Sequence, residues 1–161
     1  MIQRIQSVFL AMIILIVGTL CGIKVLHFVV VEPNIKTTEY ALNLFYFNKF
    51  ENGLLVESKL QILLIFLASV VIGLSTYTLL SFKDRLKQMK FTLINMVALS
   101  ALVIAFFTNA YLYAPNFTSE KLMVNSMIGI TLILFVLYLN IRVFYLIKKD
   151  EALVKSADRL R

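Results

Sequence analysis

The sequence is poor in the residues that build reactive sites. Its 161 residues include a single Cys, a single His and no Trp. One Cys cannot close an internal disulfide, and one His with one Cys cannot form a His/Cys metal cage or ligate two haems. The composition therefore excludes a disulfide framework, and we expect no metal site and no cofactor.

Charged residues are scarce as well. They make up 16% of the chain, whereas apolar residues make up 60% and the mean hydropathy is +0.87. A soluble domain carries about a quarter charged residues. This balance is typical of an integral membrane protein, and the length allows a single membrane domain over residues 1–161.

Long uncharged runs predict the fold class. Crossing a hydrocarbon core takes about 20 apolar residues, and only helices or closed barrels satisfy the backbone in lipid. The expected spans are residues 5–26, 60–82, 91–114 and 122–143, with an outer loop at 32–59 and a tail at 144–161. We therefore expect an all-α integral membrane protein: a four-transmembrane-helix bundle with a small outer β-hairpin loop and a cytoplasmic C-terminal amphipathic helix.

The distribution of Lys and Arg predicts the orientation. Of the 16 Lys and Arg, 11 lie at the N-terminus, in the connection between the second and third spans, or from Arg142 onward. Basic residues near span ends stay on the cytoplasmic side, so both termini are expected in the cytoplasm. This bias also accounts for the net charge of +7, and no nucleic-acid partner is expected.

The outer loop contains a strong turn signal at Asn52-Gly53, because both residues tolerate positive φ. Strands at about residues 40–51 and 54–58 would flank it. An isolated two-stranded ribbon is marginal in water, so it is expected to rest on the outer helix ends or on a partner. The alternative, a loop that dips its aromatic side chains into the headgroups, stays open.

Helix association in lipid depends on small residues and on hydrogen bonds between spans. The candidate small residues are Gly18 with Gly22, Ser69 with Gly73, Ala101 with Ala105, and Ser126 with Gly129. Antiparallel third and fourth spans would bring Asn95 near Asn140 at the cytoplasmic face, and Asn109 near Asn125 at the outer face. We expect these four amides to face protein and to fix the register of the two helices.

The spans lack the groups that membrane transporters and enzymes commonly use. No Asp or Glu lies in the four runs, although a central charge would mark a transport path because it costs about 2.5–3.5 kcal/mol. Lys24 and His27 come closest, at the outer end of the first span, and both are expected as interfacial residues. Paired Cys, paired His, or a deep Ser with a general base are missing, so no catalytic residue is expected.

The tail is expected to form a short amphipathic helix, because Leu153, Ala157 and Leu160 recur at i, i+4 and i+7 without Gly or Pro. Such a helix can cap the fourth span on anionic lipid or dock a cytoplasmic partner, and both alternatives stay open. The candidate contact residues are Lys148, Lys149, Leu153, Lys155, Arg159, Leu160 and Arg161.

The two ends of the chain carry a family resemblance. Residues 1–10 (MIQRIQSVFL) and 149–161 (KDEALVKSADRLR) resemble a family of small four-span inner-membrane proteins from Bacteroidota, a domain of unknown function (DUF4293). The resemblance implies a bacterial inner membrane and a cytoplasmic tail. It brings no known activity and no functional residues, but it strengthens the docking alternative for the tail.

These observations together favour a non-catalytic integral membrane protein that acts as an accessory or scaffold subunit of an envelope or membrane complex. The lipid bilayer would hold the bundle, and protein partners would meet the outer loop and the tail. The alternative is a transporter or channel for a small or lipid-like solute, with an uncharged path lined by Ser, Thr and Asn between the spans.

Overall fold

The computed structural model describes residues 2–31, 37–82, 84–113, 121–122 and 125–159. The elements in chain order are α1 (Ile2–Gly22), β1 (Leu26–Val31), β2 (Thr37–Leu42), β3 (Tyr46–Glu51), β4 (Leu54–Leu60), α2 (Ile62–Leu80), α3 (Arg85–Tyr113), β5 (Lys121–Leu122) and α4 (Asn125–Arg159). Each of the 4 helices contains a stretch long and apolar enough to cross a membrane, which confirms the helix number predicted from the apolar runs.

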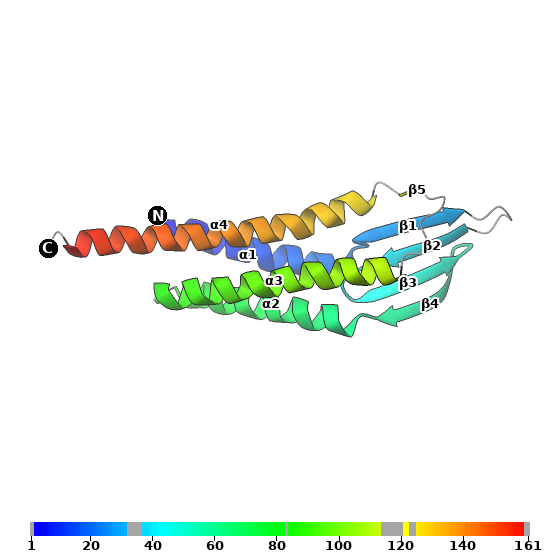
Figure 1. Cartoon of the computed structure of the whole chain (residues 1–161), viewed down its shortest axis with the longest axis horizontal. Coiled ribbons are helices and arrows are strands. Elements are labelled where there is room, and N and C mark those ends of the chain that lie inside the picture. The colour runs from blue at the N-terminus through cyan, green and yellow to red at the C-terminus, as the bar shows by residue number, and fades with distance from the viewer. Residues whose placement is uncertain (1, 32–36, 83, 114–120, 123–124, 160–161) are drawn as a thin grey trace.

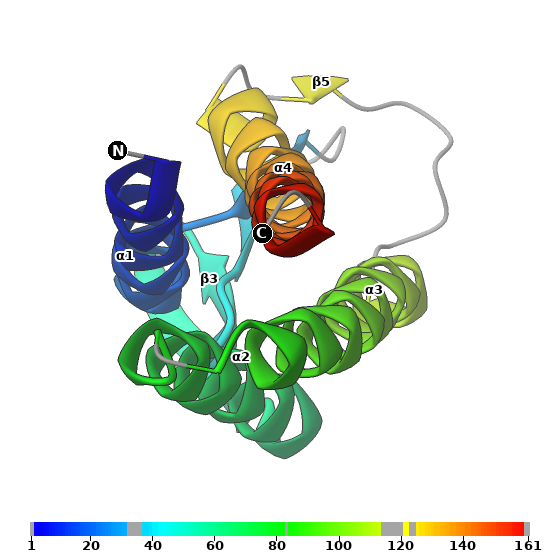
Figure 2. The ribbon, with the colours of Figure 1, turned by 90° about the vertical axis from the view of Figure 1, so that its left-hand side faces the viewer.

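The helices form a ring in which each packs on its neighbours in sequence, and α4 closes the ring on α1 (Figure 2). The turn between α2 and α3 is tight. Its backbone bonds run from Ser81 N–H to the Tyr77 carbonyl at 3.0 Å and from Asp84 N–H to the Ser81 carbonyl at 3.2 Å. So short a connection makes α2 and α3 antiparallel neighbours.

A sheet of 5 strands extends the bundle at one end, with the order β4-β3-β2-β1-β5 and antiparallel pairing throughout. Figure 1 shows the strands running roughly along the long axis of the molecule, while both chain termini lie at the opposite end. We call these two ends of the bundle the sheet end and the terminal end.

Two turns set the register of the central strands. Asn52 and Gly53 have φ values of 51° and 79°, so the predicted turn joins β3 to β4 with both residues in the left-handed region. The side chain of Asn43 accepts a hydrogen bond from the Phe45 backbone N–H at 2.9 Å. This Asn turn ends β2, and the single strand expected over residues 40–51 is therefore two strands.

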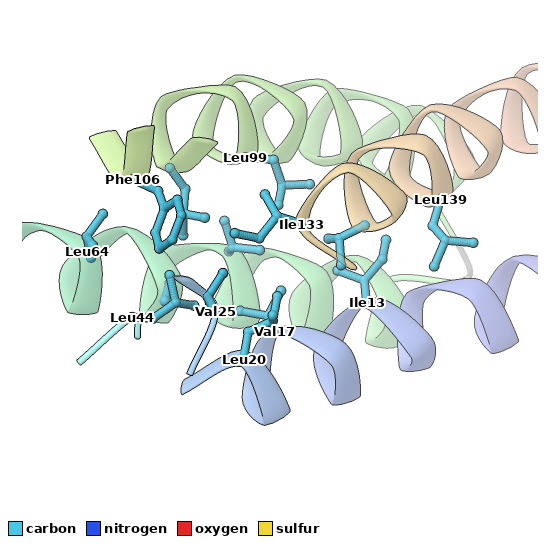
Figure 3. Close-up of a cluster of buried hydrophobic side chains, with 14 of the residues drawn as sticks. Ile13, Val17, Leu20, Val25, Leu44, Leu64, Leu99, Phe106, Ile133 and Leu139 are labelled. Carbon is cyan, nitrogen blue, oxygen red and sulfur yellow. The ribbon is translucent and has the colours of Figure 1, made fainter. Parts of the chain in front are cut away.

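The sheet and the bundle share one hydrophobic core. Leu42, Leu44 and Phe47 are buried in the same cluster as the inward side chains of the four helices. Figure 3 shows Leu44 and Val25 lying close to Leu64 and Phe106. The sheet is therefore a packed extension of the bundle and not a separate ribbon.

Besides the strand over residues 40–51, the expected boundaries were wrong at two places, and the small hairpin expected in the outer loop is part of the sheet of 5 strands. The first span was extended to residue 26, whereas α1 ends at Gly22 and the following apolar residues form β1, which pairs with β2. The tail was expected as a separate amphipathic helix, whereas α4 continues unbroken to Arg159 (Figure 1). Its 35 residues span about 52 Å at 1.5 Å per residue, and nothing between residues 144 and 152 interrupts helical geometry.

Candidate functional site

A buried polar cluster of Ser75, Thr92, Asn95 and Asn140 joins α2, α3 and α4. The Asn95 amide nitrogen donates to Ser75 Oγ at 2.9 Å and to Asn140 Oδ1 at 3.3 Å. The Asn140 amide nitrogen donates to the Thr92 carbonyl at 3.2 Å. Each of these residues is at most 1% exposed. The structure thus brings together the asparagines that were expected to pair near one face of the membrane.

The polar face of α3 continues from this cluster toward the terminal end. Gln88 donates to the Thr78 carbonyl of α2 at 3.0 Å, and Thr92 Oγ1 donates to the Gln88 carbonyl at 2.8 Å. Gln88, Thr92 and Asn95 recur at i, i+4 and i+7, which places them on one face of a helix. This spacing was visible in the sequence and could have identified the polar face, but only the asparagines were singled out.

Three buried amide atoms have no hydrogen-bond partner among the described residues: Asn95 Oδ1 on α3, Gln6 Nε2 on α1 and Gln61 Nε2 just before α2. Asn95, Gln6 and Gln61 are only 1%, 3% and 6% exposed. An unpaired buried polar atom costs roughly 1–3 kcal/mol. Gln6 was not singled out from the sequence, because a lone Gln near a chain end carries no spacing signal.

The chemistry open to the polar cluster is hydrogen bonding by amides and hydroxyls. Within the part of the chain that the structure describes, no group of three or more His, Cys, Asp or Glu is placed to hold a metal ion. The cluster therefore acts on the packing of α2, α3 and α4 against one another, and in a low-dielectric interior such bonds select one register.

The second expected asparagine pair, Asn109 with Asn125, stays a prediction, because the side chain of Asn125 lies outside the described residues. The amide nitrogen of Asn109 donates to the Ala105 carbonyl of its own helix at 2.8 Å.

Among the small residues, Gly129 makes the close approach. A Cβ at Gly129 would lie 2.5 Å from the Val25 carbonyl oxygen and 2.6 Å from Val25 Cα, so α4 touches the segment before β1 backbone to backbone. Ala101 and Ala105 on α3 are half-buried. The side chain of Ser126 lies outside the described residues.

The packing role expected for the other small residues was wrong within this chain. Gly18, Gly22 and Gly73 have no described atom within 4 Å of where a Cβ would stand. Ser69 is exposed and donates to the Phe66 carbonyl of its own helix at 2.7 Å. Small residues four positions apart recur by chance in apolar sequence. The spacing of these pairs was therefore not a reliable sign of helix packing.

A pocket of about 290 Å³ lies where α1, β1 and α4 meet at the sheet end. It is lined by Ile23, Lys24, His27, Ile128 and Gly129. The imidazole Nε2 of His27 lies 3.3 Å from Glu39 Oε2 on β2, and the ammonium of Lys24 lies 5.4 Å from the centroid of the Phe50 ring. The two ionisable residues noted near the first span thus share one pocket.

The edge strand β4 is open. All of its 7 residues are exposed, and among the described strands it pairs with β3 alone. The apolar side chains Leu54, Leu55 and Val56 are exposed by 74%, 57% and 58%. The register shifts between Lys49 and Phe50 of β3, so Val56 is an extra residue on β4 and forms a bulge.

At the terminal end, Arg85 holds the extension of α4 to the start of α3. Its guanidinium Nε lies 3.5 Å from Asp150 Oδ2, and its Nη1 donates to the Asp150 carbonyl at 3.2 Å. A pocket of about 570 Å³ beside this contact is lined by Asp84, Arg85, Leu86, Lys87 and Val154. The Lys87 ammonium donates to Asp84 Oδ2 at 2.7 Å.

The residues expected to contact a partner or lipid in the tail lie on this extension. Lys148 and Lys149 are exposed, and Leu153 is 51% exposed. The side chains of Lys155 and Arg159 and the whole of Leu160 and Arg161 lie outside the described residues. The contact of these residues with a partner or with lipid stays a prediction.

Comparison with known proteins gives a family without an assigned activity. The family model described as Domain of unknown function (DUF4293) matches residues 2–160. No curated protein and no solved structure matches the chain.

Proposed function

The chain belongs to the DUF4293 family, and from this premise we propose that it is a non-catalytic scaffold or accessory subunit of a bacterial envelope complex. The four helices would cross the inner membrane, with both termini in the cytoplasm and the sheet in the periplasm. The orientation is supported by the concentration of Lys and Arg at the terminal end, as basic residues near span ends stay in the cytoplasm.

The observation that carries the proposal is the open edge of β4. Figure 1 shows β4 running from the far end of the sheet toward α2. Each residue of a strand adds about 3.3 Å, so Leu54 lies about 20 Å farther from the helices than Leu60. The headgroup layer extends only about 6 Å outside the hydrocarbon core. The membrane therefore cannot cover Leu54, Leu55 and Val56, and an exposed apolar edge of this kind is typical of a protein-binding surface.

A second copy in the same membrane suits this edge less well than a free segment does. β4 would run toward the membrane in every copy held in the same orientation, so two copies could pair only in parallel, and parallel pairing is slightly less stable per residue than antiparallel pairing. The proposed occupant is therefore an extended segment of a different periplasmic protein. The exposed extension of α4 would offer a second contact on the cytoplasmic side.

Site-specific photo-crosslinking tests the docking surface. A photo-reactive residue at Leu55, 57% exposed on β4, is expected to capture a partner of defined mass in cells, and Leu54→Asp with Val56→Asp is expected to abolish the product. Lys59→Glu is the matched control, because it changes the charge of the same strand but leaves the apolar residues in place. The proposal fails if the double Asp variant crosslinks as well as the wild type while Lys59→Glu behaves identically.

The transporter alternative is supported by the unpaired atoms Asn95 Oδ1 and Gln6 Nε2, which a small uncharged solute could contact. The other hydrogen-bonding groups of the polar cluster are used to join helices. The scaffold function therefore has the stronger support.

A further inference from the structure

The pocket at the junction of α1, β1 and α4 is built by rigid contacts. The Ile23 backbone N–H bonds to the Thr19 carbonyl at 3.2 Å, and the Val25 N–H bonds to the Leu42 carbonyl at 2.9 Å. These bonds fix the segment that carries Lys24 between the end of α1 and the sheet. Gly129, which lines the pocket, lets α4 touch Val25 directly, so the position of α4 beside the pocket is set by the fold.

The pocket lies where the apolar part of the bundle ends. The candidate span of α1 ends at Gly22, two residues before Lys24, and that of α4 begins at Ile128. Ile23 and Ile128 are 40% and 63% exposed, so the pocket has apolar side chains on its rim beside a basic one. A phospholipid has a matching arrangement at this depth, because its apolar acyl chains are followed by a negatively charged phosphate.

The charges in the pocket favour an anion. No carboxylate is among its lining residues, and Glu39 is engaged by the His27 imidazole. Among the described residues, the Lys24 ammonium contacts the Phe50 ring and has no carboxylate partner.

We propose that this pocket binds a phosphate group, that of a phospholipid headgroup in the outer leaflet of the membrane or that of free phosphate. Lys24 would pair with the phosphate oxygens, His27 would line the site, and Ile23 and Ile128 would lie against the first carbons of the acyl chains. The volume of about 290 Å³ equals that of about ten water molecules at roughly 30 Å³ each, which leaves room for a phosphate group. This site rests on the proposed membrane placement and is independent of the partner on β4.

Native mass spectrometry of the full chain, released from mild detergent, tests the site with defined probes. The probes are phosphatidylglycerol, phosphatidylethanolamine, an uncharged diglucosyl lipid with the same acyl chains, and inorganic phosphate. The wild type is expected to retain both phospholipids over the glycolipid. Lys24→Gln is expected to reduce phospholipid retention about tenfold, as loss of a charge-assisted hydrogen bond would.

Lys59→Gln is the matched control, because it removes the same charge from the sheet outside the pocket and is expected to retain lipid normally. Phosphate retention that depends on Lys24, without preference for phospholipid over glycolipid, would support the phosphate site and assign it to free phosphate. Equal phospholipid retention by the wild type and Lys24→Gln, with both folded, would overturn the proposal. Loss of the β4 crosslink alone would leave it standing.

Discussion

Polar side chains on the helices form two kinds of hydrogen bond, within their own helix or between helices. Thr76, Ser100 and Thr108 donate to carbonyls four residues earlier in their own helices, which satisfies a hydroxyl without any neighbour. Asn95 and Asn140 instead donate across helices. The first group bonds only to the backbone of its own helix, whereas the second group joins α2, α3 and α4. Of these two groups, only the second is expected to set the register of the bundle.

A double-mutant cycle measures the central bond of the polar cluster. Asn95→Leu and Asn140→Leu are each expected to lower the free energy of unfolding in mixed micelles. Their coupling energy is expected to be about 0.6 kcal/mol, the average for hydrogen bonds between helices in a membrane protein. Reversible unfolding of the wild type, both single variants and the double variant gives this value.

Asn109→Leu provides the control for that cycle, since the Asn109 amide bonds to Ala105 of its own helix. Combined with Asn140→Leu it is expected to act additively. If the Asn95 and Asn140 pair shows no more coupling than the Asn109 and Asn140 pair, the cluster does not link α3 to α4 as described.

Among the elements, α4 has two attachments to α3 at different depths. One is the polar cluster at Asn140, and the other is the contact between Arg85 and Asp150, ten residues further along α4. The side chains of Arg85 and Asp150 are 28% and 15% exposed, so solvent screens this ion pair less than a surface pair. Beyond Asp150, the helix extends past the ring formed by its neighbours.

Removal of the Arg85 contact is expected to loosen the extension of α4. Arg85→Gln should accelerate hydrogen exchange of amides in residues 151–159 about fivefold, corresponding to about 1 kcal/mol. Lys87→Gln is the control, since the Lys87 pair with Asp84 is mostly exposed and lies within one turn of α3. Equal exchange in the Arg85→Gln variant and the wild type would show that the extension is held by helix propensity alone.

The sequence predicted the helices well and the strands poorly, for physical reasons. Uncharged length is a sufficient signal for a helix that must satisfy its own backbone in lipid. The segment LHFVVV, residues 26–31, is apolar enough to continue a span, and hydropathy cannot distinguish it from the strand that it forms with β2. The split between β2 and β3 depended on one side-chain turn at Asn43, which the apolar run around it concealed.

The candidate sites also differ in how far the sequence could predict them. The antiparallel order of α3 and α4 follows from a short outer connection, so Asn95 and Asn140 could be brought together from the sequence. The pocket around Lys24 and His27 could not, because it requires the segment between α1 and β1 to pack against α4. The open edge of β4 also needed the strand order, which depends on pairings between residues far apart in the chain.

The whole molecule is a four-helix ring with a sheet fixed to one end by a shared core. Since Leu42, Leu44 and Phe47 are buried with the helix side chains, the sheet is expected to keep its position relative to the bundle. A partner on β4 would thus be held at a defined height above the membrane. The proposed scaffold role depends on the sheet and the termini lying on opposite sides of that membrane.

Cysteine labelling of intact bacterial cells tests this topology directly. In a Cys21→Ser background, which removes the single Cys, a new Cys is placed at Leu55 on β4 or at Lys149 on the α4 extension. After permeabilisation of the outer membrane, a membrane-impermeant maleimide is expected to label Leu55→Cys at once and Lys149→Cys only after lysis. Labelling of Lys149→Cys before lysis, or protection of Leu55→Cys, would contradict the proposed topology.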